Sequence, residues 1–217
     1  MSEFNESYIG IRKDVLELVP TRVKTVLDVG CSNGALGEQI KKEFKARVEG
    51  IDFDKNMSKV AAKKLDKVII ADLENIDLKK NFKAGQFDCI IFADILEHLT
   101  DPWKTLSEFT DILKDKGVII ISYPNVRHIS SLFSVIVGGY WPYRDRGIHD
   151  RTHLRFFTLK NLKQMFQSAD LRVKKIQRNY RIFDQPARIN RATKFLALPI
   201  LKEFLAYQYV ISLEKNI

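Results

Sequence analysis

The first 125 residues alternate short apolar runs with amphipathic stretches, and this alternation limits the possible folds more than any other feature of the chain. The apolar runs are four to six residues long and rich in Val, Ile and Leu, as buried strands are. The stretches between them place apolar side chains at helical spacing. Strands that alternate with helices build βαβ units, whose parallel strands are buried on both faces. The pattern therefore predicts an α/β protein with a doubly wound, Rossmann-like sheet.

We expect seven strands, mostly parallel, with one antiparallel strand at the edge. The predicted strands cover residues 24–29, 47–51, 67–70, 87–92, 117–122, 171–182 and 204–213. The predicted helices cover residues 8–19, 35–44, 54–64, 102–113, 126–137 and 159–168. Thr158 is expected to cap the last of these helices. Residues 186–203 are expected to form a helical connection that bends at Pro199.

Composition excludes several classes of protein. The chain of 217 residues is 45% hydrophobic and has two cysteines, so neither disorder nor a disulfide scaffold is expected. No apolar run reaches the roughly 18 residues that a membrane span needs. The first ten residues lack the basic and apolar regions of a secretory signal. We therefore expect a cytoplasmic protein, with peripheral contact to the inner face of a membrane left open.

The net charge of +9 is concentrated in one late segment. Residues 141–194 hold 14 Lys and Arg against 4 Asp and Glu, whereas the rest of the chain is nearly balanced. A localised positive field of this kind favours a phosphate-bearing substrate, a nucleic acid or an anionic membrane surface.

A glycine-rich turn follows the first predicted strand, and acidic residues follow the next two. The turn contains Gly30 and Gly34 and opens a helix, so a ligand can approach its backbone amides. Asp52 comes at the end of the second strand, where it suits the hydroxyls of a ribose. Asp72 ends the third strand and can accept a hydrogen bond from an adenine amine. These groups are expected to meet at the carboxyl edge of the sheet, which predicts a nucleoside site.

Other nucleotide sites do not match. A P-loop needs a Gly-Lys pair, and the chain has none. The dinucleotide fingerprint fails because Ser32 stands where its second glycine belongs. No tyrosine is followed four residues later by lysine, as a short-chain reductase would require. A nucleoside cofactor without a pyrophosphate fits better.

Four motifs together resemble the class I S-adenosylmethionine-dependent methyltransferases. They are the run DVGCSNG at 28–34, GID at 50–52, ADL at 71–73 and FADILEHL at 92–99. The resemblance covers about the first 125 residues, and Ser32 departs from it where the family often has glycine. It implies S-adenosylmethionine as cofactor. The cofactor-binding residues implied are Asp28, Gly30, Cys31, Ser32, Asn33, Gly34, Asp52, Phe53, Asp72, Leu73, Ala93 and His98.

Within that set, the resemblance assigns parts of the cofactor to parts of the chain. The glycine turn would meet the methionine portion, Asp52 the ribose, and Asp72 with Leu73 the adenine. Ala93 would face the sulfonium, and His98 would line the same pocket. The chain is then one domain with three parts, a cofactor-binding half (1–125), an acceptor-binding insertion (126–157) and a completion of the sheet (158–217).

The insertion is similar to that of ubiquinone-biosynthesis methyltransferases, and more so to relatives from bacterial surface-polysaccharide clusters. This resemblance implies an anionic saccharide or glycolipid precursor, small or lipid-linked, as the acceptor. Arginines can grip phosphate through paired hydrogen bonds, and aromatic rings can stack on a sugar. The candidate substrate-binding residues are Arg127, Tyr140, Trp141, Arg144, Arg151 and Arg155.

Two histidines of the insertion are candidate catalytic bases. An alkyl hydroxyl needs a base before it can attack a methyl group, and histidine titrates near neutral pH. His153 is preferred over His149 because THLRFFT at 152–158 resembles a recurring element of the family. Either histidine can instead be structural. A metal site formed by His149, Asp150 and His153 is conceivable, but no metal is expected.

Two rival functions stay open. The basic segment would suit an RNA methyltransferase acting on ribose. Methylation of base amines is disfavoured, because residues 93–96 lack the expected Pro-Pro-aromatic motif, and nucleic acid is not the expected partner. Alternatively, the chain is a cofactor-binding adaptor whose basic, apolar stretch at 188–207 docks on a partner or a membrane. The sequence does not separate O- from N-methylation, nor does it give an oligomeric state.

Overall fold

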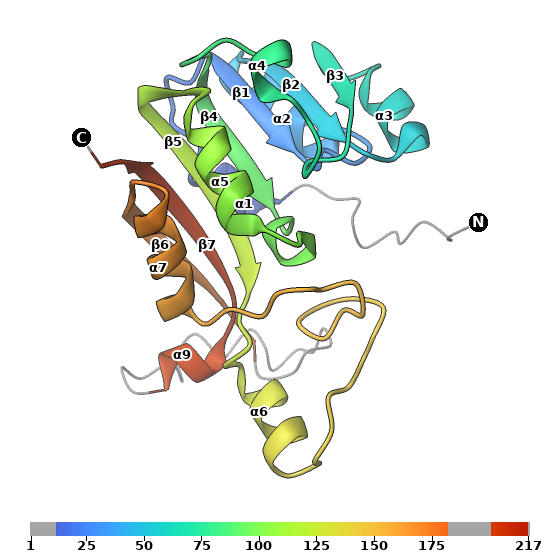
Figure 1. Cartoon of the computed structure of the whole chain (residues 1–217), viewed down its shortest axis with the longest axis vertical. Helices are drawn as coiled ribbons and strands as arrows, with labels where there is room; N and C mark the ends of the chain where they lie inside the picture. The colour runs from blue at the N-terminus through green and yellow to red at the C-terminus, as the bar shows by residue number, and fades with distance from the viewer. Residues whose placement is uncertain (1–11, 182–200, 217) are drawn as a thin grey trace.

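The computed structural model describes residues 12–181 and 201–216, and their strands form a single sheet (Figure 1). The strands are β1 (Thr25–Val29), β2 (Arg47–Asp52), β3 (Lys67–Ile70), β4 (Phe87–Ala93), β5 (Leu113–Pro124), β6 (Leu171–Tyr180) and β7 (Ala206–Lys215). Their order in the sheet is β3-β2-β1-β4-β5-β7-β6. β7 runs antiparallel to both of its neighbours, whereas the other pairs are parallel. The predicted seven-stranded Rossmann-like fold is confirmed, and its antiparallel strand belongs to the pair at one edge, with β6 outermost.

Helices cover both faces of the sheet. The α-helices of the described residues are α1 (Lys13–Leu16), α2 (Ala35–Phe44), α3 (Lys55–Ala61), α4 (Leu78–Asn81), α5 (Pro102–Thr110), α6 (Ile129–Ile136), α7 (Leu159–Ser168) and α9 (Lys202–Leu205). A short 3-10 helix, η2, spans Leu96–His98. Apolar side chains of α1, α2 and α3 pack on one face, and those of α4, α5 and α7 pack on the other. This arrangement is the doubly wound architecture that alternating strands and helices predict.

Each strand contributes side chains to both apolar layers because successive side chains point to opposite faces of the sheet. In β1, Val26 packs in the layer of α1 to α3, whereas Leu27 and Val29 pack in the opposite layer. Asp28 lies between them in sequence and shares the face of Val26. The buried acid of β1 is therefore on the side of the sheet that α2 covers.

Polar side chains set the starts of several helices. The Asp54 carboxylate accepts hydrogen bonds from the amides of Asn56 and Met57 at the start of α3. Thr158 and Asn161 form a capping box at the start of α7, as expected for a threonine before an apolar-periodic run. These local signals explain why the predicted helix at 159–168 matches α7 to the residue.

Most predicted boundaries shift by one to four residues, including β7, which spans Ala206–Lys215 and not 204–213, and α3, which ends at Ala61 and not 64. α5 ends at Thr110, and β5 begins at Leu113, because Leu113 pairs with Phe87 of β4 across an irregularity in the register. α6 begins at Ile129 because β5 continues to Pro124 and the His128 side chain caps the helix. α4 was not predicted. Residues 8–11 of the first predicted helix and most of the predicted connection at 186–203 lie outside the described residues.

The insertion after β5 leaves the body of the protein as α6 and a long loop (Figure 1). Residues 137–157 then return toward the sheet without a regular helix or strand. In the described part of the chain, no helix is both long and apolar enough to cross a membrane.

Candidate active site

The glycine turn at the carboxyl end of β1 depends on left-handed backbone at two glycines. Gly30 and Gly34 have φ angles of 72° and 74°. A Cβ atom on Gly30 would collide with the side chain of Ile95, and one on Gly34 would lie 3.0 Å from the Cα atom of Ala61. The amide of Gly30 donates to the carbonyl of Ile51 at 2.8 Å, which ties the turn to the end of β2.

Asp52 connects this turn to the start of α3. Its Oδ2 accepts from the Ser32 amide at 2.7 Å, and its Oδ1 accepts from the Asp54 amide at 2.9 Å. Burial raises the pKa of Asp52, while these backbone amides act in the opposite direction. The prediction that the glycine turn and Asp52 meet at one edge is consistent with this geometry.

Asp28 and Cys31 are buried beneath the turn. Burial, together with the charge of Asp52, raises the pKa of Asp28 to about 7. Its Oδ2 atom has no hydrogen-bond partner. Burial and the nearby carboxylates of Asp28 and Asp52 raise the pKa of the Cys31 thiol, so this thiol is not an activated nucleophile.

The remaining predicted cofactor residues follow the neighbouring strands. Phe53 comes directly after Asp52, and its side chain is 78% exposed. Asp72 comes after β3, where its carboxylate accepts from the Glu74 amide at 3.0 Å and from Asn75 at 2.7 Å. Leu73, half-buried, packs against the core. The set also includes Asn33, whose side chain accepts from the Ala35 amide, and Ala93, which ends β4 beside Ser122.

Three titratable side chains gather just after β4. Glu97 and His98 belong to η2, and His153 comes from the insertion. Their candidate ligand atoms all lie within 4.8 Å of one another. The Nε2 atom of His153 is 4.0 Å from Oε1 of Glu97, and the two imidazole rings are 4.8 Å apart in an edge-to-face arrangement. The structure thus joins the preferred base candidate to the FADILEHL motif.

Backbone hydrogen bonds hold this cluster together. The carbonyl of Glu97 accepts from the amides of Leu154 and Arg155, at 2.8 and 3.1 Å. Thr152 Oγ1 lies 3.1 Å from Nδ1 of His98. The return of the insertion to η2 therefore fixes where His153 stands.

Burial disfavours the charged forms of all three side chains. Burial, with the charge of Asp94 adding to it, raises the pKa of Glu97 well above its ordinary value. Burial lowers the pKa of His98. Burial and the neighbouring His98 lower the pKa of His153 to about 4. At neutral pH the two imidazoles are therefore uncharged, and the low pKa makes His153 a weaker proton acceptor than an exposed histidine unless a bound ligand raises it.

A carboxyl and two imidazoles are also the donor types that bind divalent transition metals. The set is Glu97, His98 and His153, which differs from the one considered from sequence. His149 instead packs edge-to-face on Trp141 at 4.8 Å, and the Asp150 carboxylate accepts from the amide and hydroxyl of Thr152. That no resident metal is needed stays a prediction.

The predicted arginines have separate partners. Arg127 stacks over the ring of Phe204, and Arg151 pairs with Asp145 at 2.8 Å. Arg155 donates through Nε to the carbonyl of Thr100 at 3.0 Å and lies over the ring of Trp103. Arg144 forms an isolated bridge with Asp150 through its backbone. The phosphate clamp stays a prediction.

The two aromatic candidates also differ in their surroundings. Tyr140 is 58% exposed, whereas the Trp141 ring lies between His149 and Phe156, with centroid distances of 4.8 and 4.9 Å. Trp141 thus packs inside the insertion, and Tyr140 remains available for contact.

A network around Asp94 was missed from the sequence. Asp94 accepts hydrogen bonds from Arg12, from Ser122 at 2.7 Å and from Gln208 at 2.6 Å. Arg12 also pairs with Asp14 at 2.9 Å. The motif at 92–99 contains Asp94, but nothing in the sequence distinguished Asp94 or Arg12, which are 82 residues apart in the chain.

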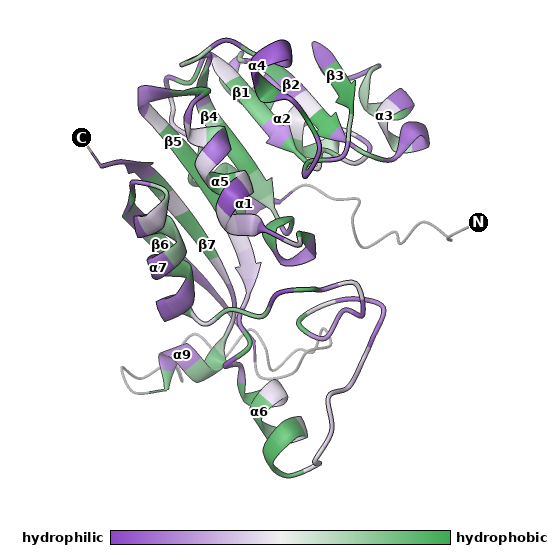
Figure 2. Cartoon of the chain, viewed as in Figure 1, coloured by the Kyte–Doolittle hydropathy of each residue, from purple (hydrophilic) through white to green (hydrophobic). Residues whose placement is uncertain are grey.

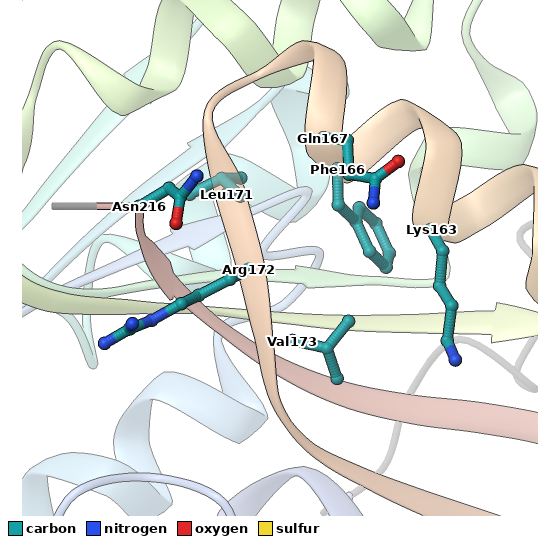
Figure 3. Close-up of a pocket in the computed structure, with 7 residues that line it drawn as sticks. All are labelled: Lys163, Phe166, Gln167, Leu171, Arg172, Val173 and Asn216. Carbon is teal, nitrogen blue, oxygen red and sulfur yellow. The ribbon is translucent and has the colours of Figure 1, made fainter.

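A shallow pocket lies elsewhere, between α7 and β6 (Figure 3). Lys163, Phe166 and Arg172 are among the side chains that line it. None of the predicted site residues lines this pocket. It is therefore separate from the carboxyl edge of β1 to β4.

The carboxyl edge fits a ligand that brings hydrogen-bond donors. Oδ2 of Asp28 and Oγ of Ser32 are buried at the glycine turn without a partner. Leaving such atoms unpaired costs about 1–3 kcal/mol each, so a ligand that pairs with them would be favoured. The ammonium and ribose hydroxyls of S-adenosylmethionine are donors of this kind.

Comparison with known proteins agrees with this geometry. Residues 4–176 match a family described as a methyltransferase domain. The ubiquinone biosynthesis O-methyltransferase of Psychrobacter cryohalolentis is 32% identical over 68% of this chain, and that of Coxiella burnetii is 28% identical over 74%. The chain spans 58% and 69% of the lengths of these two relatives.

Solved structures show the same architecture. A SAM-dependent methyltransferase from Archaeoglobus fulgidus superposes with a TM-score of 0.67 at 20% identity, over 97% of each chain. The fold, the motifs at the ends of β1 to β4 and the family match all lead to one conclusion. The chain belongs to the class I S-adenosylmethionine-dependent methyltransferases.

Proposed function

We propose that the chain transfers the methyl group of S-adenosylmethionine to a hydroxyl oxygen of its acceptor, leaving S-adenosylhomocysteine. The observation that carries the proposal is the buried cluster of Glu97, His98 and His153 beside the end of β4. It places a neutral histidine next to the edge where the family motifs put the cofactor. The relatives, whose names describe O-methyltransferases, support oxygen as the acceptor atom.

The chain's own residues would hold the cofactor at the carboxyl edge. Asp52 would accept from the ribose, Asp72 and Leu73 would meet the adenine, and the turn around Gly30 would receive the methionine portion. When bound, S-adenosylmethionine supplies an electrophilic methyl group. The catalytic contribution of the protein is then to align the acceptor, exclude water and remove a proton.

His153 is the proton acceptor in this proposal. Its ring is nearly buried, and its Nδ1 lies 3.3 Å from the carbonyl of Ile148, which leaves Nε2 directed to the side of Glu97. A neutral Nε2 can take the acceptor's hydroxyl proton as the oxygen attacks the methyl group. His149 is the second candidate, and its packing on Trp141 favours a structural role.

The acceptor class we propose is a small or lipid-linked saccharide that carries an anionic group. The net positive charge of residues 141–194 supports this class, with residues 126–157 as the acceptor-binding insertion. Arg127, Arg144, Arg151 and Arg155, together with Tyr140 and Trp141, remain its proposed contacts. A hydroxylated aromatic ring with a lipid tail is the second candidate, favoured by the names of the relatives.

We place the enzyme in the cytoplasm, in peripheral contact with the inner face of the membrane. The basic, apolar segment 188–207 lies mostly outside the described residues. Nucleic acid is not the proposed partner.

The test is to incubate the purified protein with methyl-labelled S-adenosylmethionine and total cell extract, and then to partition the label. We expect label in the organic or small-molecule fraction, and mild acid or base treatment separates glycan-linked from aromatic products. Label that is sensitive to nuclease would replace the proposal with the RNA rival. Binding of S-adenosylmethionine without any methyl transfer would favour the alternative function, a cofactor-binding adaptor.

A further inference from the structure

A network of polar side chains meets at the carboxyl end of β4. Its centre is Asp94, which follows the apolar residues 89–93. The Asp94 carboxylate accepts hydrogen bonds from the side chains of Arg12, Ser122 and Gln208. Figure 2 shows β4 as a largely hydrophobic strand, so this carboxylate marks a change from apolar core to polar edge. The Asp94 side chain is 27% exposed, so a ligand at the edge of the sheet can approach it.

The turn that carries Asp94 packs against the glycine turn. A Cβ atom on Gly30 would lie 2.0 Å from Cδ1 of Ile95, the residue after Asp94. Asp94 itself has left-handed backbone, with a φ angle of 58°, which residues other than glycine adopt rarely. Asp94 is therefore held beside the turn that would receive the methionine portion of the cofactor.

The charged side chains of this network are one guanidinium and two carboxylates. Arg12 pairs with Asp94 and, at 2.9 Å, with Asp14. Ser122 and Gln208, which also donate to Asp94, are uncharged. The network therefore has a net negative charge, and a negative charge in a partly desolvated place favours a cation.

The charge of Asp94 reaches the neighbouring side chains more strongly than that of Arg12 does. Burial raises the pKa of Glu97 most, the charge of Asp94 adds to this effect, and the charge of Arg12 opposes it by less. Burial lowers the pKa values of His98 and His153, and the charge of Asp94 acts against burial in both. The ion pair thus leaves a negative potential on the side of the buried cluster, where the methyl group would be transferred.

The cofactor and its product differ in charge at the sulfur atom. Methyl transfer forms a C–O bond to the acceptor and breaks a C–S bond, and the electron pair of the broken bond stays on sulfur. The sulfonium thereby becomes an uncharged thioether. Both molecules keep the ammonium and carboxylate of their amino-acid portion, so a charge placed near the sulfur can distinguish one from the other.

We propose that Asp94 is a specificity-determining residue whose carboxylate favours the sulfonium cofactor over the thioether product, and that Arg12 limits this preference. The inference deepens the proposed function, and it rests on that function for the position of the methionine portion. Asp94 would hold S-adenosylmethionine more tightly than S-adenosylhomocysteine. The loss of charge at sulfur would then help the product to leave.

The test is to measure the Kd of S-adenosylmethionine and that of S-adenosylhomocysteine for the full chain by isothermal titration calorimetry. The readout is the ratio of the product Kd to the cofactor Kd. Asp94→Asn removes the negative charge at nearly constant size and should lower this ratio by at least about threefold. Arg12→Gln removes the opposing charge and should raise the ratio by at least about threefold. Asp115→Asn, whose side chain is 87% exposed in the parent, is the control and should leave the ratio unchanged.

Opposite shifts in the two variants separate a charge effect from a structural one. A network that only supports the fold would change both Kd values together and leave the ratio as it is. An unchanged ratio in either variant, or shifts in the same direction, would overturn the inference. Because these measurements need no acceptor, a failure of methyl transfer would contradict the proposed function without altering the ratios.

A measurement on the parent protein covers the case in which Asp94→Asn does not fold, which its Tm would reveal. Sinefungin carries an ammonium in place of the sulfonium. The parent should bind sinefungin at least about threefold more tightly than S-adenosylhomocysteine, because the ammonium restores the positive charge beside Asp94. Equal affinity for these two compounds would overturn the inference.

Discussion

Asp52 shows how one carboxylate can serve both the fold and a ligand. Its two oxygens accept from the amides of Ser32 and Asp54, which belong to the glycine turn and to the start of α3. A ribose bound at this edge would therefore meet a side chain already fixed by its backbone neighbours. Such preorganisation lowers the cost of binding.

Substitution Asp52→Ala is expected to weaken S-adenosylmethionine binding by about 1–3 kcal/mol, because the ribose hydroxyls would lose their acceptor. Isothermal titration calorimetry measures the change. Asp115→Ala, at an exposed position in β5, is the control and should leave affinity unchanged. Unaltered affinity in the Asp52 variant would remove this residue from the cofactor site.

Asp28 should make stability depend on pH. Unfolded, its carboxyl loses a proton near pH 4, but burial holds the folded pKa at about 7, so the native state binds more protons between these values. Its contribution to the free energy of unfolding is present below pH 4 and is lost as pH rises to 7. The free energy of unfolding of the Asp28→Asn variant, relative to that of the parent, should therefore rise by roughly 1–3 kcal/mol from pH 4.5 to pH 8.

Denaturant unfolding at several pH values measures this difference. The comparison with the parent isolates Asp28, since carboxylates such as Asp66 and Asp88, whose pKa values are lowered, contribute equally to both proteins. A difference that stays constant with pH would show that Asp28 is ionised throughout the range.

His153→Ala is expected to lower turnover by about 10²-fold or more while cofactor affinity is retained, because a general base is lost. Turnover is measured with the acceptor fraction that takes up label, and affinity by calorimetry. His149→Phe, which keeps a ring against Trp141, is the companion variant. Full activity in the His153 variant would show that His153 is not the general base. The base would then be His149, or catalysis would depend on positioning alone.

At the scale of the element, helix caps and turns carry information that is local in sequence. At the start of α7, the side chain of Thr158 accepts a hydrogen bond from the amide of Asn161, and the side chain of Asn161 accepts one from the amide of Thr158. The glycine turn ends with Gly34 at the N-cap of α2. Because these signals lie within a few residues of the boundary, helices at 35–44 and 159–168 were predicted to the residue.

Thr158→Ala should lower the free energy of unfolding by about 1 kcal/mol, the usual cost of a lost cap. Thr110→Ala, at the end of α5, removes a hydroxyl that bonds to Ser107 but caps no helix start, and it should change stability by less than about 0.5 kcal/mol. Chemical denaturation of both variants provides the comparison. Equal effects would mean that the capping box contributes little.

Boundaries and contacts set by distant partners could not be predicted. Leu113 joins β5 because Phe87 lies opposite it, and the sequence of 102–113 alone continues as a helix. The cluster forms because the insertion returns to η2, which brings His153 beside Glu97. The sequence identified most of the individual residues through motifs, but not this juxtaposition or the pairing of Arg12 with Asp94.

At the scale of the whole molecule, the proposed cofactor site draws on turns after β1, β2, β3 and β4. A ligand there would contact segments that are far apart in sequence and would resist their separation. Binding to the native state alone stabilises it by an amount that depends on ligand concentration.

S-adenosylhomocysteine at about 100 times its Kd should add about 2.7 kcal/mol to the free energy of unfolding, which corresponds to a Tm increase of about 5–10 °C. Differential scanning fluorimetry measures the shift. The Asp52→Ala protein at the same ligand concentration should show a smaller one. If a saturating concentration leaves the parent Tm unchanged, the proposed cofactor site is wrong.

The position of β7 has a consequence for the order in which the protein is made. β6 pairs with no strand of the described sheet other than β7. β7 in turn pairs with β5, with Val118 opposite Glu214. During translation, β1 to β5 can assemble as they emerge, but β6 must wait until residues 206–215 have left the ribosome. Closing so long a loop is slow, so the nascent chain exposes the apolar side of β5 for an interval that chaperones would have to protect.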